Sequence, residues 1–104
     1  MIERIDKIKA YLQKSPDDCF LNHALALEYI KLGDDIHAGE LFKKNMAYEP
    51  SYLATYYHYA KLLERLGDEQ RAIAVYEQGM EQSKKAGDNH TFSELRSAYE
   101  ELTF

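Results

Sequence analysis

The sequence predicts an all-α protein of antiparallel helix pairs, with about six helices. The tripeptide Leu-Gly-Asp at 32–34 recurs at 66–68, a shift of 34 residues. The same shift relates Ala26 to Ala60, Ala38 to Ala72, Phe42 to Tyr76, and Pro16 to Pro50. No linker rich in glycine or serine interrupts the chain. A fixed period of this length is the signature of a helical repeat protein.

Each unit is expected to form two helices joined by a tight turn. Gly33 follows a helical apolar pattern, and glycine tolerates the left-handed conformation that ends a helix. Asp34 comes next and is a good N-cap for the second helix, which Pro50 then breaks. That helix has apolar positions at Ile36, Leu41, Phe42 and Tyr48. Gly67 and Asp68 repeat the plan, and without a proline at 84 the following helix should continue to about Ala86.

Small residues are expected where the two helices of a pair cross. Short connections force the helices to pack antiparallel. Ala26 with Ala38, and Ala60 with Ala72, would then allow close approach of the backbones. Larger side chains fill the space beside each crossing.

These positions resemble the tetratricopeptide repeat (TPR) pattern. The first unit supplies Asn22, Leu25, Ala26, Tyr29, Ala38, Phe42 and Pro50, and the second supplies Tyr56, Tyr59, Ala60, Leu63, Ala72 and Tyr76. The resemblance implies a right-handed α-α superhelix. The departures are Asn22 at a position for a large residue, Asn45 at a usually small one, and Lys84 in place of proline. We expect Asn22 to leave the first helix pair with less packing.

The resemblance covers nearly the whole chain, so we expect one TPR-like domain over 1–104. It divides into an N-terminal half-repeat at 2–16, repeat 1 at 17–50, repeat 2 at 51–86 and a capping helix at 88–102. Arg96 falls where Ala26 and Ala60 lie in the other first helices. A bulky charge fits there only if no further helix packs on that face, which indicates a cap.

Composition narrows the function classes. The net charge of −5 disfavours binding to nucleic acid and to anionic membranes. The first residues alternate charged and apolar side chains, unlike a secretory signal, and no apolar run is long enough to span a membrane. The single cysteine, Cys19, fits a reducing compartment. The sequence thus predicts a cytoplasmic protein.

Neither an enzyme nor a metal site is predicted, and we expect no cofactor. No nucleophile elbow, phosphate loop or dinucleotide fingerprint is present. The paired carboxylates are expected at helix caps and solvated faces. His23, His37, His58 and His90 include no His-x3-His pair.

Binding of another protein is the function that the resemblance implies. In TPR proteins the first helices of successive units line a concave face that binds peptides. Carried over by repeat phase, that face comprises Phe20, His23, Leu27, Ile30, Lys31, Tyr57, His58, Lys61, Glu64, Arg65, Ser93 and Ser97, with His90 and Glu101 beside them. His23 and Leu27 stand where some relatives carry a lysine–asparagine carboxylate clamp, so that clamp is absent.

The partner's identity stays open at this level. We expect its segment to place an apolar group against the first helix and an acidic group near Lys61 or Arg65. The alternative function is a self-associating structural module that dimerises through its terminal helices. This alternative rests on the opening half-repeat, whose helix lacks a partner on its outer face. Ile2 is expected to be exposed there, and exposed apolar residues favour association. The chain would then be a monomer or a weak homodimer.

Overall fold

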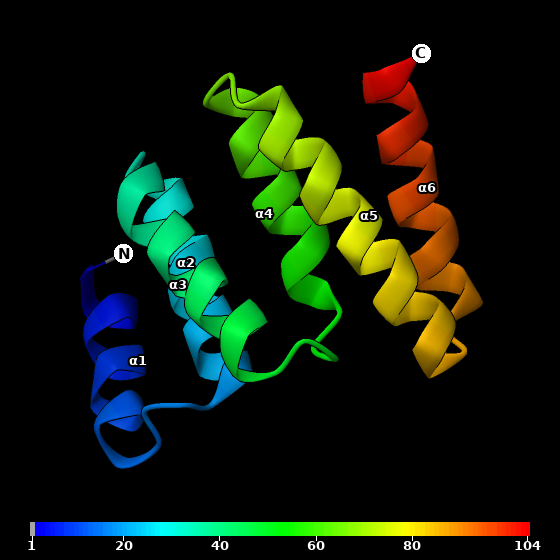
Figure 1. The fold of residues 1–104 in the computed structure, drawn as a ribbon. Helices are drawn as coiled ribbons and strands as arrows, with labels where there is room; N and C mark the ends of the chain where they lie inside the picture. Colours follow the sequence, from blue (N-terminus) through cyan, green and yellow to red (C-terminus); the bar gives the residue numbers. More distant parts are fainter. Residues whose placement is uncertain (1) are drawn as a thin grey trace. The chain divides into compact units, whose positions relative to one another are not determined.

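The computed structural model describes the backbone of residues 2–104 and the side chains from residue 3 onward. This part of the chain forms six helices and no strand, which confirms the all-α prediction (Figure 1). The helices are α1 (Ile2–Lys14), α2 (Cys19–Lys31), α3 (Asp35–Tyr48), α4 (Ala54–Arg65), α5 (Glu69–Ala86) and α6 (Asn89–Thr103). They form two compact units, one of α1–α3 and one of α4–α6, with the boundary between Glu49 and Pro50. The Ile2 side chain, and with it the expected exposure, lies outside the described residues.

Glycine and aspartate make the helix-to-helix turns as predicted. Gly33 and Gly67 follow the ends of α2 and α4 with φ of 79° and 81°, in the left-handed region that disfavours a Cβ. The Asp34 carboxylate accepts the His37 backbone N–H at 3.2 Å, and the Asp68 carboxylate accepts that of Arg71 at 3.2 Å. Each turn therefore ends one helix and caps the next within a few residues.

In the first unit, α2 pairs with α3 and α1 packs on α2 (Figure 1). Ile5 and Ile8 of α1 form a buried cluster with Leu25 of α2. Ala26 and Ala38 are both fully buried, as a close helix crossing requires. Ile5, Ile8 and Leu12 are three or four residues apart, and this spacing places them on the one face of α1 that packs against α2.

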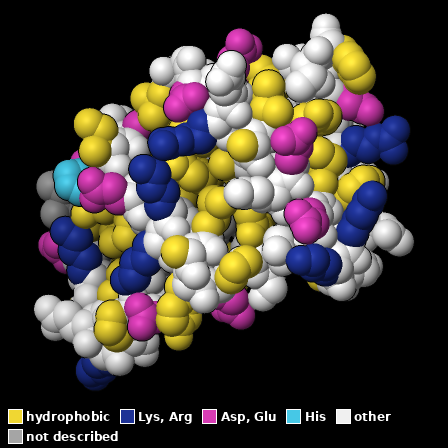
Figure 2. All heavy atoms as spheres, in the orientation of Figure 1, with side chains coloured by type: hydrophobic (Ala, Val, Ile, Leu, Met, Phe, Trp, Pro, Cys, Tyr) yellow, Lys and Arg dark blue, Asp and Glu magenta, His cyan; other side chains and the backbone are white. Residues whose placement is uncertain are grey.

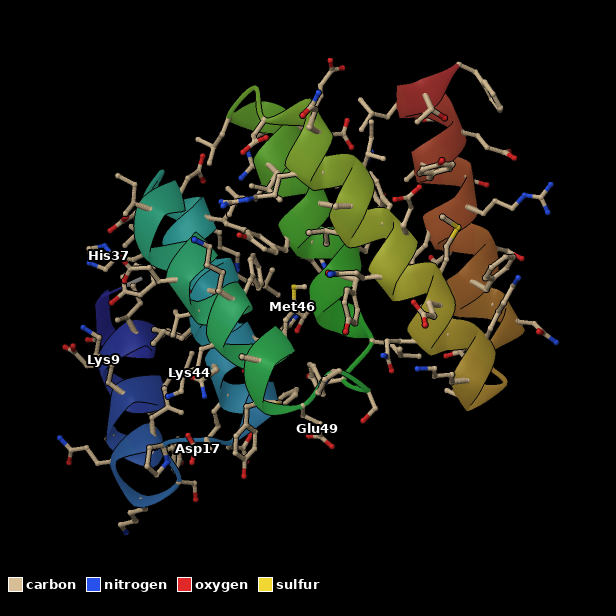
Figure 3. The ribbon with its side chains drawn as sticks, viewed as in Figure 1. Lys9, Asp17, His37, Lys44, Met46 and Glu49 are labelled. Carbon is tan, nitrogen blue, oxygen red and sulfur yellow. The ribbon has the colours of Figure 1, made fainter. Side chains whose placement is uncertain are left out.

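Polar side chains tie the connections of this unit to its helices. Asn22 donates to the carbonyl oxygens of Pro16 at 3.0 Å and Asp18 at 2.9 Å. Asn45 of α3 donates to the Cys19 carbonyl oxygen at 2.9 Å. Lys44, also on α3, donates to the Pro16 carbonyl oxygen at 2.7 Å and lies beside Asp17 (Figure 3).

Asn22, for which the sequence predicts less packing in the first helix pair, is buried and hydrogen-bonded. Its side chain is only 2% exposed, and its amide satisfies two carbonyl groups that precede or begin α2. A buried amide with its donors paired contributes order where a large apolar residue would contribute only packing. Asn45, 1% exposed, acts in the same way between α3 and α2.

In the second unit, α5 lies between α4 and α6 and packs against both (Figure 1). Ala60, Ala72 and Tyr76 are fully buried. The Tyr76 hydroxyl donates to the Glu64 carboxylate at 2.5 Å, which joins α5 to α4. As predicted, α5 continues past Lys84 to Ala86, where Gly87 ends it with φ of 70°.

Several apolar residues at the ends of the helices are exposed. Leu32 is 48% exposed, Ile36 74% and Leu66 56%. All three flank the Gly-Asp turns, where the chain reverses and the neighbouring helix no longer covers the side chain. Tyr48, at the end of α3, is 60% exposed for the same reason.

The burial of Ala72 gives a stability prediction. Ala72→Arg should lower the free energy of unfolding by about 3 kcal/mol or more, because the new side chain overpacks the α5 face and buries a charge. Ala74→Arg is the matched control, since Ala74 is exposed on the same helix and should change stability by less than about 0.5 kcal/mol. Urea unfolding of both variants measures the difference. A loss below about 1 kcal/mol for Ala72→Arg would contradict the packing described.

Candidate functional site

A surface hollow lies between α4 and α6 in the second unit. Its larger part, about 460 Å³, is lined by Leu53, Ala54, Tyr57, His58, Asp88, Thr91, Glu94 and Leu95. Its smaller part, about 260 Å³, is lined by Tyr57, Lys61, Glu94, Ser97, Ala98 and Glu101. Tyr57 and Glu94 belong to both parts, so we treat them as one feature, the α4/α6 hollow.

Helical spacing explains which side chains line the hollow. The lining residues of α4 are three or four positions apart, or adjacent, and therefore share one face of the helix. They are Ala54, Tyr57, His58 and Lys61. The opposite face of α4 is buried and carries Tyr56, Tyr59 and Leu63. The alternation of buried and exposed tyrosines therefore directs Tyr57 away from the core, as its position in the sequence predicted.

Tyr57 and Lys61 form the centre of the α4 side. Tyr57 is 38% exposed, and the Lys61 Nζ lies 5.7 Å from the centre of its ring. The same Nζ lies 3.7 Å from the Glu64 carboxylate. Lys61 is thus held along its own helix by an aromatic face and a carboxylate.

His58 lies edge-on to Tyr57, with the ring centres 5.8 Å apart. Its side chain is half-buried, and this burial lowers the pKa of the imidazole below its usual value. Desolvation disfavours the charged form, so His58 is neutral at pH 7 and adds no positive charge to the hollow.

The structure places five of the predicted α4 and α6 residues around the hollow, namely Tyr57, His58, Lys61, Ser97 and Glu101. Glu64, Arg65 and Ser93 do not line it. Glu64 instead accepts the Tyr76 hydroxyl of α5. On α6, Thr91 and Glu94 line the hollow, whereas their predicted neighbours His90 and Ser93 do not.

The five predicted residues on α2 differ in their availability. Phe20 is 68% exposed and Lys31 is exposed, while Leu27 and Ile30 are half-buried. His23 is only 8% exposed and lies 5.6 Å, ring centre to ring centre, from Phe42 of α3. Its expected place on an open binding face is therefore not what the structure shows: packing against Phe42 turns the ring into the helix pair.

Lys31 takes part in a charge cluster that joins α1 to α2. The Glu28 carboxylate, 4% exposed, lies 3.0 Å from the Lys31 Nζ and 3.2 Å from the Arg4 Nε. The hydrogen bond from Lys31 and the two positive charges lower the pKa of Glu28. A nearly buried carboxylate keeps its charge here because two cations face it.

The chemistry of these residues suits binding. Among the described residues, no group of three or more histidine, cysteine or acidic side chains is placed to hold a metal ion. Burial raises the pKa of the Cys19 thiol, so it stays protonated and is a poor nucleophile. In the same part of the chain, no helix is long and apolar enough to cross a membrane.

Charges of both signs are interspersed on the surface. On the face drawn in Figure 2, basic and acidic side chains alternate over both units. Many of them pair within a helix, as Lys85 does with Glu81 at 3.6 Å and Arg96 with Glu100 at 3.1 Å. Arg96 thus points to solvent.

Known proteins resemble this chain in sequence and in structure. No protein-family model matches the chain. Among curated proteins, the pre-mRNA-splicing factor CLF1 of Eremothecium gossypii is 34% identical over 82 residues, which are 75% of this chain. The chain spans only 12% of that protein's length.

Solved structures give a fuller match. The crystal structure of a tetratricopeptide repeat domain protein from Salinibacter ruber is 37% identical, with a TM-score of 0.78 over 83% of this chain and 96% of the other. A solution structure of a tetratricopeptide repeat domain protein from Salinibacter ruber is 38% identical, with a TM-score of 0.81 over 84% and 88%. A protein from Bordetella parapertussis, 21% identical, shares the fold with a TM-score of 0.81 over 95% and 86%.

Helical repeat modules of this fold commonly mediate protein–protein interaction, and they are typically non-catalytic scaffolds. The repeat spacing, the buried alanines and the Gly-Asp turns are features of a helical repeat, and the two Salinibacter ruber domains match this chain in sequence and fold over most of their length. The chain therefore belongs to the tetratricopeptide repeat family.

Proposed function

We propose that the chain is a single protein-binding module, residues 1–104, that binds a peptide or protein segment on the concave face of its first helices. The observation that carries the proposal is the α4/α6 hollow. It is a concave surface between α4, the first helix of repeat 2, and α6, the helix that follows this repeat. A partly exposed aromatic side chain, Tyr57, lies at its centre. Exposed aromatic residues in concave settings are favoured as anchors of protein interfaces.

In the first unit, Phe20 and Leu27 hold the positions on α2 that the lining residues Ala54 and Lys61 hold on α4, by the 34-residue repeat. Ile30 and Lys31 correspond to Glu64 and Arg65. Phe20 offers a large exposed apolar group for an interface. His23 drops out, because its ring packs against Phe42. No cofactor enters the proposal, and we propose a cytoplasmic location because a protein-binding module with a free thiol fits that compartment.

Tyr57→Ala tests the proposal. A partner captured from the native host on the immobilised full chain should bind the variant more weakly by about 1–2 kcal/mol, because the mutation removes the aromatic anchor. The free energy of unfolding should change by less than about 1 kcal/mol, since Tyr57 is not part of the core. Calorimetric titration and urea unfolding give the two values.

Tyr48→Ala is the matched control. Tyr48 is 60% exposed at the end of α3, a second helix of its pair, and it does not line the hollow. Its removal should leave partner affinity unchanged. If Tyr57→Ala binds as well as the wild type while Tyr48→Ala binds more weakly, the binding surface lies on the second helices and the proposal fails.

A further inference from the structure

The α4/α6 hollow carries more negative than positive charge. Asp88, Glu94 and Glu101 line it, and Lys61 is the basic residue among the lining side chains of its two parts. His58 adds no charge at neutral pH because burial lowers its pKa. Three carboxylates against one ammonium group make the hollow electronegative.

The positions of these charges strengthen the imbalance. The Lys61 ammonium lies over the Tyr57 ring and 3.7 Å from Glu64, so a carboxylate outside the hollow already offsets its charge. Asp88 accepts hydrogen bonds from the Thr91 backbone N–H at 3.0 Å and the Thr91 hydroxyl at 2.8 Å, which lower the pKa of its carboxyl and keep it ionised. Glu94 lies 3.7 Å from the His90 imidazole, which is 85% exposed.

The wall beneath these charges is apolar. Leu95 is fully buried, Ala98 is 6% exposed, and the Tyr57 ring stands between the two parts. A long side chain with an aliphatic stem and a positive head fits both features at once. The stem would lie along the exposed part of the Tyr57 ring and Ala98, above the buried Leu95, and a planar guanidinium would pair with the Glu94 carboxylate.

We infer that the α4/α6 hollow recognises a basic segment of a partner protein, and that an arginine side chain of that segment enters it. The inference rests on the proposed function and specifies the partner's chemistry. The charge of the partner's group is thus opposite to the one expected from the sequence. The sequence predicts an acidic group of the partner near Lys61 or Arg65. Lys61 is already compensated by Glu64, while Glu94 and Glu101 were brought beside it by the orientation of α6.

The test is a selection from a random twelve-residue peptide library on the immobilised full chain. Peptides enriched on the wild type should contain arginine and lysine well above their frequency in the library. Their dissociation constants, measured by fluorescence anisotropy, should rise at least tenfold for the double variant Glu94→Gln/Glu101→Gln. Lys61→Gln should bind the same peptides more tightly, because it removes the one opposing charge.

The matched control is Glu77→Gln/Glu81→Gln, which removes two exposed carboxylates of α5 that do not line the hollow. It changes the net charge equally and should bind as the wild type does within twofold. Circular dichroism checks that all variants keep the helical fold. Equal weakening by both double variants would show that net charge alone acts, and would overturn the inference.

Other outcomes separate the inference from the proposed function. Peptides that are acidic or neutral and that lose binding with Tyr57→Ala would overturn the inference while supporting binding on the concave face. Peptides that bind equally well to wild type and Tyr57→Ala would overturn both, as would a selection that enriches none.

Discussion

The close approach of α5 to both of its neighbours at Gly79 is the constraint on which the second unit depends. A Cβ at this position would lie 2.7 Å from the Tyr56 Cβ of α4 and 2.9 Å from the Leu95 Cδ1 of α6. Glycine lets α5 sit between the two helices and so sets their separation. Tyr56 precedes Tyr57, and Leu95 lines the hollow itself. The spacing set at Gly79 therefore reaches the candidate site directly.

Two hydrogen bonds from buried tyrosine side chains fix the orientation of α4 relative to α5. The Tyr56 hydroxyl donates to the Pro50 carbonyl oxygen at 2.6 Å, and the Tyr76 hydroxyl donates to Glu64. Burial, and then the Glu64 carboxylate, raise the pKa of Tyr76, so the donated proton stays in place. With these bonds made, Tyr57 and Lys61 face α6, and Glu64 is occupied within the fold. Lys61 is therefore compensated by Glu64, and the carboxylates that line the hollow outnumber its one ammonium group.

The repeat could be predicted from the sequence because its signals are local. Gly33 and Gly67 needed only their own backbone conformation, and the alanines at helix crossings needed only the 34-residue period. The role of Asn45 was missed because its amide donates to the Cys19 carbonyl oxygen, 26 residues earlier in the chain. The role of Asn22 was missed because the repeat pattern does not show the course of the chain from Pro16 to Asp18, whose carbonyl groups it binds. The lining of the hollow by Glu94 was missed because the orientation of α6 depends on its packing against α5, which the repeat period does not specify.

Replacement of Gly79 by alanine, measured by the free energy of unfolding, tests this account most directly. Alanine is the better helix former by about 1 kcal/mol, so helix propensity alone predicts stabilisation. The clash of the new Cβ with the Tyr56 Cβ predicts destabilisation, because it can be relieved only if α5 moves away from α4. We expect a loss of about 1–3 kcal/mol. A gain in stability would show that α5 does not approach α4 this closely and would contradict the account.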